Sequence, residues 1–503
     1  MAVVSTSIPV PARLRTPAVS VARLVALAPL LAILTLQAVA SLSLRNTAFQ
    51  DEANYLYIGR EIFNHLVYGL PMYEPFAPRY LSGSAYLYPL LAGALDRFWG
   101  LDAARDVSLC CMLFTTTAVY LLATRLYDRN SAVVAAGLFA FQGPVLFLGH
   151  LATYDALCLA LLALATVLAL SADAAREPVV AMVVGAVLLA AVATKYVGVL
   201  FVPGVLAILA WQARAVRGWR LALGRVAAAL LVASGGTIIL LKCGAWEAVR
   251  GSTVERHIAG GIARLVLAHQ VATLGGLVLA LALLGLLLSG RRRLPIALVL
   301  LGAGLLAPAY HLYEDEPVSL PKHVAFGLVF AAPLAGYVVA RLGGYGRGAV
   351  VGRRWLASLA VCLVLFGWGL RQAQALVAEW PNSAALMQVL LTQVRPGAGH
   401  ILAEEAEVPR YYLQNLVAWW QWNHLFWFDY TDAAGRHLSG VAAYKAAIAE
   451  GYFDLVILRY GPNAATAHAI DGGLRHGKRY KLIARVPYNT VYGPGYYWIW
   501  HKT

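Results

Sequence analysis

Long apolar runs, separated by short polar and arginine-rich segments, recur along the sequence up to residue 371. An α-helix of about 20 apolar residues spans the hydrocarbon core of a bilayer, so runs of this length predict membrane-crossing helices. The composition agrees, since 13% of the residues are charged, against roughly 25% in a soluble domain. We therefore expect a polytopic α-helical membrane protein with spans near 21–42, 107–124, 131–148, 155–171, 178–194, 197–212, 226–241, 266–289, 294–310, 324–340 and 355–371.

The placement of arginines predicts which helix ends face the cytoplasm. Arginines concentrate in alternate loops, as is typical of a cytoplasmic face, and acidic residues gather in the others. We interpret 21–42 as a retained span, because the apolar core of a cleaved signal peptide has only about 7–15 residues. The N-terminus is then cytoplasmic, residues 43–106 form a first outer loop, and about eleven spans leave the C-terminus outside. We expect a plasma-membrane or inner-membrane protein, and the Ala, Arg, Leu and Gly bias suggests a bacterial genome.

One apolar stretch, 84–98, is short, contains Pro89 and ends in charged residues. If it crossed the membrane, every later loop would change sides and the arginine clusters would lie outside. We therefore expect a juxtamembrane or re-entrant helix within the first outer loop.

The pattern changes after residue 371, where short β-prone runs replace the long apolar ones. We expect a transmembrane domain over 1–371 and a small extracytoplasmic α/β domain over 372–503. Its strands should lie near 400–405, 453–460, 480–487 and 496–502, with a helix over 441–451.

The net charge of +15 would by itself suit nucleic acid as well as a membrane. Because the arginines form short clusters between apolar runs, we expect the lipid bilayer as their partner and no nucleic acid. The five cysteines form no C-x-x-C pair, so we expect neither a metal cluster nor a disulfide framework.

Carboxylates at the membrane edge are the first candidates for chemistry. Asp51 and Glu52 lie in the first outer loop, where ordinary surface acids are the other explanation. Asp155 begins an apolar run, where a carboxylate is costly unless paired, although it would also suit helix N-capping. The predicted topology places Asp51 and Asp155 on the same side. Together they could bind a divalent cation such as Mg²⁺ or Mn²⁺, or one could act as a general base.

Cationic residues on the same side could bind a phosphate group. Lys195 lies between two apolar runs, Lys322 and His323 begin another, and Arg79 precedes the stretch 84–98. In each case the alternative is an interfacial side chain that extends its charge to water.

Two further segments have more ordinary explanations. The acidic run 311–317 is expected to be a solvated loop. The aromatic run 418–430 would suit stacking against a sugar acceptor, but packing at a membrane interface or in a domain core is the more frequent explanation, and we favour it.

The order of these motifs resembles the GT-C superfamily of membrane glycosyltransferases, in particular the branch of protein O-mannosyltransferases and lipid A aminoarabinose transferases. The resemblance covers about residues 20–340 and a soluble C-terminal domain. The matching segments are Asp51-Glu52 in QDEANYLYIGR, the juxtamembrane segment YLSGSAYLYPLLAG, Asp155 in ATYDALCLALLAL, and Thr194-Lys195. The chain departs from the pattern before the juxtamembrane helix, where relatives carry His-Pro-Pro or Lys-Pro-Pro and only Pro89 remains.

The resemblance implies transfer of a sugar from a polyprenyl-phosphate donor to an extracytoplasmic acceptor, with inversion at the anomeric carbon. It implies Asp51 as the base, with Glu52 and Asp155 orienting the acceptor or binding a metal. Lipid, glycan and protein acceptors all stay open, as does the choice between a hexose and a pentose. The donor phosphate would contact Lys195, Lys322 or His323.

A lipid-linked glycan transporter or flippase is the main alternative, because such proteins also combine many helices with intramembrane charges. The sequence shows no inverted repeats, and a trailing soluble domain is unusual for transporters. A lipid-carrier polymerase or ligase would share the donor but not the early acidic pair. A non-catalytic relative could have lost the carboxylates, which are present here.

Overall fold

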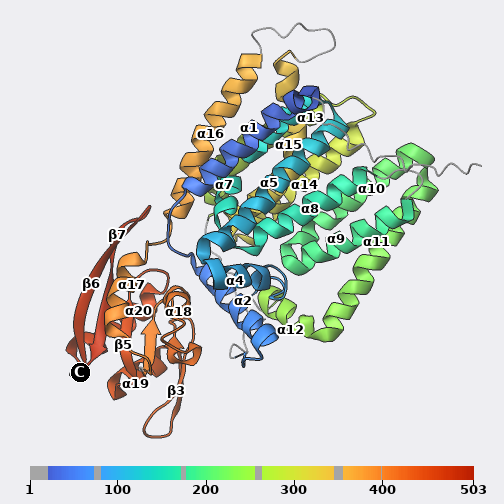
Figure 1. Ribbon diagram of the computed structural model, residues 1–503. Coiled ribbons are helices and arrows are strands. Elements are labelled where there is room, and N and C mark those ends of the chain that lie inside the picture. The colour runs from blue at the N-terminus through green and yellow to red at the C-terminus, as the bar shows by residue number, and fades with distance from the viewer. Residues whose placement is uncertain (1–20, 73–80, 172–176, 255–262, 345–354, 398) are drawn as a thin grey trace, which may run out of the picture.

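The computed structural model describes residues 21–72, 81–171, 177–254, 263–344, 355–397 and 399–503. The chain forms a body of packed helices and a smaller unit built on a β-sheet, which lies beside one end of that body (Figure 1). Each part has an apolar core of its own, and the sheet carries one apolar cluster on each face.

Seven of the described helices are long and apolar enough to cross a membrane, or eight if one bent pair forms a single span. The predicted polytopic helical membrane fold is therefore confirmed. Helices suit a bilayer because they satisfy their backbone hydrogen bonds internally. The predicted number of about eleven spans stays a prediction, since some apolar helices, such as α8 and α9, are shorter. The helices of the body are α1 (Val21–Ser43), α5 (Leu101–Leu126), α6 (Arg129–Ala140), α7 (Gly143–His150), α8 (Tyr154–Leu170), α9 (Glu177–Thr194), η1 (Tyr196–Phe201), α10 (Val202–Arg217), α11 (Trp219–Leu240), α12 (Trp246–Val249), α13 (Arg264–Leu287), α14 (Leu294–Glu314), α15 (Leu320–Leu342) and α16 (Trp355–Val377).

The run 131–148, which we expected as one continuous span, is broken into α6 and α7, which meet at 65°. Pro144 lies in the first turn of α7, and a proline has no N–H to continue the preceding helix. The N–H of Gly143 donates to Oε1 of Gln372 at 3.3 Å, and a Cβ on Gly143 would collide with that side chain. Pro144 is a local signal for this break that the prediction of one continuous span left out, whereas the contact with Gln372 of α16 depends on the tertiary fold.

The helix at the centre of the body is α15, since 94% of its most apolar stretch is buried. It packs against α6, α13 and α14. The approach to α14 is close at Gly327, where a Cβ would lie 2.3 Å from the carbonyl oxygen of Gly304. This central position explains why Lys322 and His323, in the first turn of α15, are both buried.

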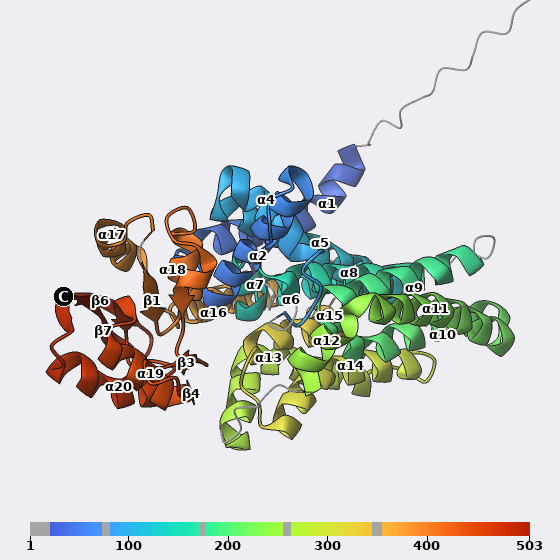
Figure 2. The same cartoon turned by 90° about the horizontal axis from the view of Figure 1, so that it is seen from below.

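Two short helices, α2 (Gln50–Tyr68) and α4 (Tyr88–Trp99), lie between the body and the sheet unit (Figures 1 and 2). They pack closely because Gly59 of α2 faces Pro89 and Gly93 of α4, with no room for a Cβ. At 1.5 Å per residue, the 12 residues of α4 extend about 18 Å, less than the hydrocarbon core of about 30 Å. This length suits the juxtamembrane helix expected over 84–98, whose position relative to the bilayer stays a prediction.

The residues after α16 form an α/β unit around a five-stranded sheet of order β2-β1-β5-β7-β6. Strands β2, β1 and β5 are parallel, whereas β7 is antiparallel to both β5 and β6. The strands are β1 (His400–Ala403), β2 (Trp422–Asn423), β5 (Phe453–Leu458), β6 (Tyr480–Thr490) and β7 (Gly493–Lys502), with a separate hairpin of β3 (Asp429–Thr431) and β4 (His437–Ser439). The helices are α17 (Ala384–Gln393), α18 (Glu407–Tyr412), α19 (Gly440–Glu450) and α20 (Ala464–His476).

Each of the four runs expected as strands overlaps one, although β6 and β7 extend beyond their predicted bounds. Helix α19 occupies most of the region expected as a helix over 441–451. It ends at Gly451, whose φ of 72° is readily adopted only by glycine. The location of this unit outside the membrane stays a prediction.

Candidate active site

A cavity of about 740 Å³ lies where α2, α8, α14 and α15 meet, beside the segment 237–252. Its lining combines two chemistries. The polar part includes Asp51, Tyr55, Tyr154, Lys195 and Lys322. The apolar part includes Val197, Val199, Leu200, Leu241, Trp246 and Val249. A space of this size and composition can accept a charged group together with part of an apolar chain.

Asp51 is the second residue of α2, so its carboxylate benefits from the positive end of the helix dipole. It contacts Lys322, with 2.5 Å between Oδ2 and Nζ. The Asp51 side chain is 37% exposed, whereas that of Lys322 is 8% exposed. The Lys322 ammonium also lies 5.1 Å from the centre of the Phe49 ring. Asp51 is thus held by one charged partner and still accessible from the cavity.

Asp155 is the second residue of α8 and forms an ion pair with Lys195, which joins α9 to η1. Both side chains are buried. The residue before Asp155 is Tyr154, whose ring centre lies 5.4 Å from the Lys195 ammonium. The Tyr154 hydroxyl accepts a 2.7 Å hydrogen bond from the Tyr55 hydroxyl. Because Tyr55 and Tyr154 also stack, α2 and α8 are tied together beside the two ion pairs.

Glu52 does not line the cavity, although it is adjacent to Asp51 in sequence. Its carboxylate accepts two hydrogen bonds from the Arg105 guanidinium and one each from the N–H groups of Phe49 and Ala152, all at 2.7–2.8 Å. Burial raises the pKa of Glu52, but Arg105 and the two N–H donors outweigh it and hold the pKa below its ordinary value. A carboxylate with this many partners fixes the start of α2 and is poorly placed to take a proton from a substrate.

His323 lines the cavity and is joined to His311 of α14, with 2.8 Å between Nδ1 of His323 and Nε2 of His311. Nδ1 of His311 lies 2.5 Å from the carbonyl oxygen of Glu316, which only accepts, so this nitrogen carries the proton. The expectation of a solvated loop over 311–317 is therefore wrong at two of its residues, because His311 and Glu316 are buried. The acidic residues between His311 and Glu316 suggested that this segment is exposed. The packing of α14 against α15 instead buries these two side chains.

The possible divalent cation at Asp51 and Asp155 stays a hypothesis. Each carboxylate already faces a lysine ammonium, which neutralises its charge. Within the described parts of the chain, no group of three or more His, Cys, Asp or Glu side chains could hold a metal ion. Arg79, expected as a phosphate ligand, lies outside the described residues.

The aromatic run 418–430 divides between core and surface. Trp422 and Phe428 are buried, and Phe428 packs against Tyr444 with 5.0 Å between ring centres. Trp420 and Trp427 are more than half exposed. Core packing, which we favoured, therefore accounts for the first two residues.

Comparison with known proteins supports the resemblance. A family model described as dolichyl-phosphate-mannose-protein mannosyltransferase matches residues 94–238. The structure is similar to that of ArnT from Cupriavidus metallidurans in the apo state, with a TM-score of 0.63, 15% identity, and coverage of 96% of this chain and 98% of that one. A search of the curated proteins found no match.

Two ligand-bound structures are also similar. ArnT from Cupriavidus metallidurans bound to undecaprenyl phosphate has a TM-score of 0.62 and 13% identity, over 95% of this chain and 98% of that one. Archaeal oligosaccharyltransferase AglB from Archaeoglobus fulgidus, in complex with an inhibitory peptide and a dolichol-phosphate, has a TM-score of 0.55 and 14% identity, over 93% of this chain and 74% of that one. The fold of nearly the whole chain is therefore similar to that of ArnT and AglB, and the mannosyltransferase family model over 94–238 agrees with the predicted resemblance.

Proposed function

We propose that this protein transfers a sugar from a polyprenyl-phosphate donor to a hydroxyl of an extracytoplasmic acceptor, with Asp51 as the catalytic base. The observation that carries the proposal is one cavity lined by a partly exposed carboxylate, two lysines and an apolar wall. A carboxylate can accept the proton of a hydroxyl, ammonium groups bind phosphate, and apolar walls suit a lipid chain.

The donor phosphate would lie between Lys195 and Lys322, with the polyprenyl chain along the apolar lining and the sugar toward Asp51. Similar structures of ArnT and AglB hold undecaprenyl phosphate and dolichol-phosphate, which supports this class of donor. His323 is a further phosphate ligand in this proposal. Because its Nδ1 donates to Nε2 of His311, its Nε2 would donate to the phosphate only when the ring is doubly protonated and cationic.

Lys322 would couple donor binding to the availability of Asp51. Its ammonium contacts the Asp51 carboxylate, and a donor phosphate would compete for the same ammonium. Asp51 would therefore be released toward the acceptor once the donor is in place, which limits reaction of an acceptor in its absence.

In the reaction, the acceptor oxygen forms a bond to the anomeric carbon while Asp51 takes its proton. The bond between the anomeric carbon and the phosphate oxygen breaks, and polyprenyl phosphate leaves with the electron pair. Lys195 and Lys322 neutralise the charge that develops on the phosphate. Attack opposite the leaving phosphate inverts the anomeric configuration. No step is assigned to a metal ion.

Asp155 and Glu52 would act through other residues. Asp155 holds the Lys195 ammonium in place, and Glu52 holds the first turn of α2 against Arg105. The acceptor class and the sugar, hexose or pentose, are the variable parts of the proposal. We place the cavity on the extracytoplasmic side, with the N-terminus cytoplasmic and the chain in a bacterial inner membrane. No described feature favours a flippase.

The test uses the full chain in lipid nanodiscs, supplied with radiolabelled polyprenyl-phosphate sugars and membrane acceptors. Asp51→Asn removes the base and keeps the shape, so turnover should fall by about 10²- to 10⁴-fold. The matched control is Asp106→Asn, because Asp106 is an exposed carboxylate on α5 and should leave turnover unchanged. Equal turnover by wild type and Asp51→Asn would remove Asp51 from the chemistry. Absence of turnover with every donor, together with movement of the intact lipid-linked sugar across the bilayer, would favour a flippase.

A further inference from the structure

The sheet unit contacts α2 and its surroundings through the short helix α18. Three consecutive residues of α18 each contact a different segment, and Figure 2 shows α18 beside α2. Arg410 reaches α2, Tyr411 reaches α4, and the hydroxyl of Tyr412 accepts the N–H of Ala48 at 2.9 Å, in the loop before α2. Helix α18 therefore connects the C-terminal unit to α2, to α4 and to the loop before α2.

The contact of Arg410 lies one helical turn from Asp51. Its guanidinium donates to Oδ1 of Asn54 at 2.9 Å and lies 4.7 Å from the centre of the Tyr57 ring. One turn of helix is about 5.4 Å, so a shift of Asn54 moves the Asp51 carboxylate by a similar amount. Arg410 of the C-terminal unit is therefore placed to influence the position of Asp51 relative to Lys322.

The contact of Tyr411 joins three helices. Its hydroxyl donates to Oδ1 of Asp96 at 2.7 Å, and Asp96 also forms an ion pair with Arg60 of α2 at 2.5 Å. Tyr411 is buried in the same apolar cluster as Tyr55, Ile58 and Tyr88. Burial raises the pKa of Asp96, although Tyr411 and Arg60 oppose that effect. The first-loop core is thus completed by a tyrosine from the C-terminal unit.

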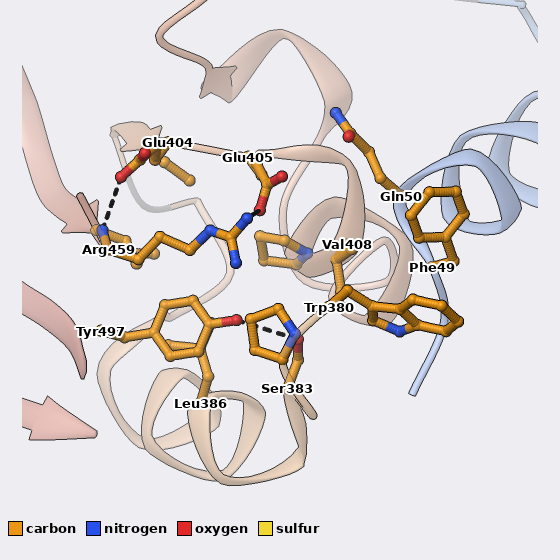
Figure 3. Close-up of a pocket in the computed structure, with 14 residues that line it drawn as sticks. Phe49, Gln50, Trp380, Ser383, Leu386, Glu404, Glu405, Val408, Arg459 and Tyr497 are labelled. Atoms are coloured by element: carbon orange, nitrogen blue, oxygen red, sulfur yellow. Dashed lines mark hydrogen bonds and ion pairs between the residues drawn. The ribbon is translucent and has the colours of Figure 1, made fainter. Parts of the chain in front are cut away.

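A small cavity lies in the seam beside α18. It is lined by Phe49, Gln50, Trp380, Glu405 and Arg459, and Figure 3 shows Phe49 and Trp380 opposite the Glu405–Arg459 pair. The indole N–H of Trp380 also donates to the carbonyl of Thr47 at 3.1 Å. These contacts hold the segment before α2 against the C-terminal unit.

We propose that Arg410 and Tyr411 are positioning residues, through which the C-terminal α/β unit sets the orientation of α2 and of the Asp51 carboxylate. The kinetic test of this inference rests on the proposed function, whereas its test by backbone hydrogen exchange rests on the structure alone. Small displacements of a catalytic group reduce the rate steeply while ground-state binding of the lipid donor changes little. A positioning defect should therefore lower kcat and leave KM for the donor nearly unchanged.

The test is a double-mutant cycle across the joint, in the full chain in nanodiscs. Arg410→Ala and Asn54→Ala should each lower kcat by at least about ten-fold, with KM for the donor within about two-fold of wild type. The double variant should be no slower than the slower single variant, because both remove the same contact. Arg410→Lys, which can still donate to Asn54, should recover part of kcat. The control is Arg436→Ala, which removes an exposed arginine that pairs with the buried Asp432 in the same unit and should leave kcat unchanged.

Hydrogen exchange of the backbone amides in 50–60 supplies the second readout. Exchange there should be faster in Arg410→Ala and in Tyr411→Phe than in wild type, and unchanged in Arg436→Ala. If wild type shows no sugar transfer but exchange rises in these variants, the proposed function falls and the positioning role stands. Additive effects on kcat, or unchanged exchange in both variants, would overturn the positioning role.

Discussion

Two lysine–carboxylate pairs lie beside the same cavity but differ in exposure. The side chains of Asp155 and Lys195 are 1% and 6% exposed, whereas Asp51 is 37% exposed against 8% for its partner Lys322. Removing one member of a buried pair leaves an unpaired charge in an apolar surrounding. If Asp51 were lost, Lys322 would still line the cavity and would keep the attraction of Asp155. The difference suggests that the Asp155 pair maintains the structure and the Asp51 pair provides the reactive group.

The largest effect on stability is expected at Asp155. Asp155→Ala leaves the Lys195 ammonium buried without its carboxylate and should lower the free energy of unfolding by about 3–5 kcal/mol. Unfolding of the purified protein in mixed detergent micelles measures this loss. The double variant Asp155→Ala/Lys195→Met should recover much of it, because it removes both charges. A loss below about 1 kcal/mol in the single variant would contradict the structural role of the pair.

The pH dependence of stability at Glu405 and Arg459 tests whether burial also changes the pKa of a paired carboxyl group in the C-terminal unit. Burial raises the pKa of Glu405 from 4.5 to about 7, and Arg459 only partly opposes it. The folded state thus favours the protonated acid. This contribution is fully present below pH 4.5 and is lost as the pH rises through 7, up to about 3 kcal/mol. Thermal unfolding followed from pH 4.5 to 8 should show the decline, and Glu405→Gln should flatten it. An unchanged slope in Glu405→Gln would assign the decline to other groups.

Lys322 should matter more for binding than for folding. A hydrogen bond to a charged group contributes about 1.5–3 kcal/mol, so Lys322→Met should weaken the binding of undecaprenyl phosphate by roughly 10- to 100-fold. Equilibrium binding to the protein in nanodiscs measures the change. Lys481→Met, at an exposed lysine of β6, is the control and should bind as wild type does. Equal affinity in the two variants would remove Lys322 from the donor site.

The smallest effect on stability is expected at Asp51. Asp51→Asn keeps an oxygen that can still accept from the Lys322 ammonium, and Asp155 also attracts that ammonium, so the free energy of unfolding should change by about 1 kcal/mol. The same unfolding measurement used for Asp155→Ala provides the comparison. A loss as large as that of Asp155→Ala would show that both pairs are structural and would weaken the assignment of Asp51 as the base.

Sequence reasoning indicated the residues of the site better than their partners. Lys195, Lys322, Asp51 and Asp155 were all selected because charges are rare beside long apolar runs, and the structure brings all four together. It did not indicate which lysine meets which carboxylate, since that depends on how α2, α8 and α15 pack. His311 was missed because the acidic residues that follow it suggested exposure.

Asp51 and Glu52 show that sequence reasoning also fails to separate the roles of two adjacent residues. Consecutive residues of a helix point about 100° apart, so the two carboxylates face different surroundings. Asp51 faces the cavity, and Glu52 faces Arg105. An acidic pair in sequence therefore predicts chemistry nearby without saying which member performs it.

The sequence by itself determined the helical membrane class and the β-strands of the C-terminal unit, because apolar runs and alternating patterns are local properties that a bilayer or a sheet selects directly. Only the tertiary structure decided the two lysine pairings and the contacts of Arg410 and Tyr411 with α2 and α4. Those features join residues between 40 and 356 positions apart. Their stability comes from satisfying buried charges and hydrogen bonds, which no local pattern records.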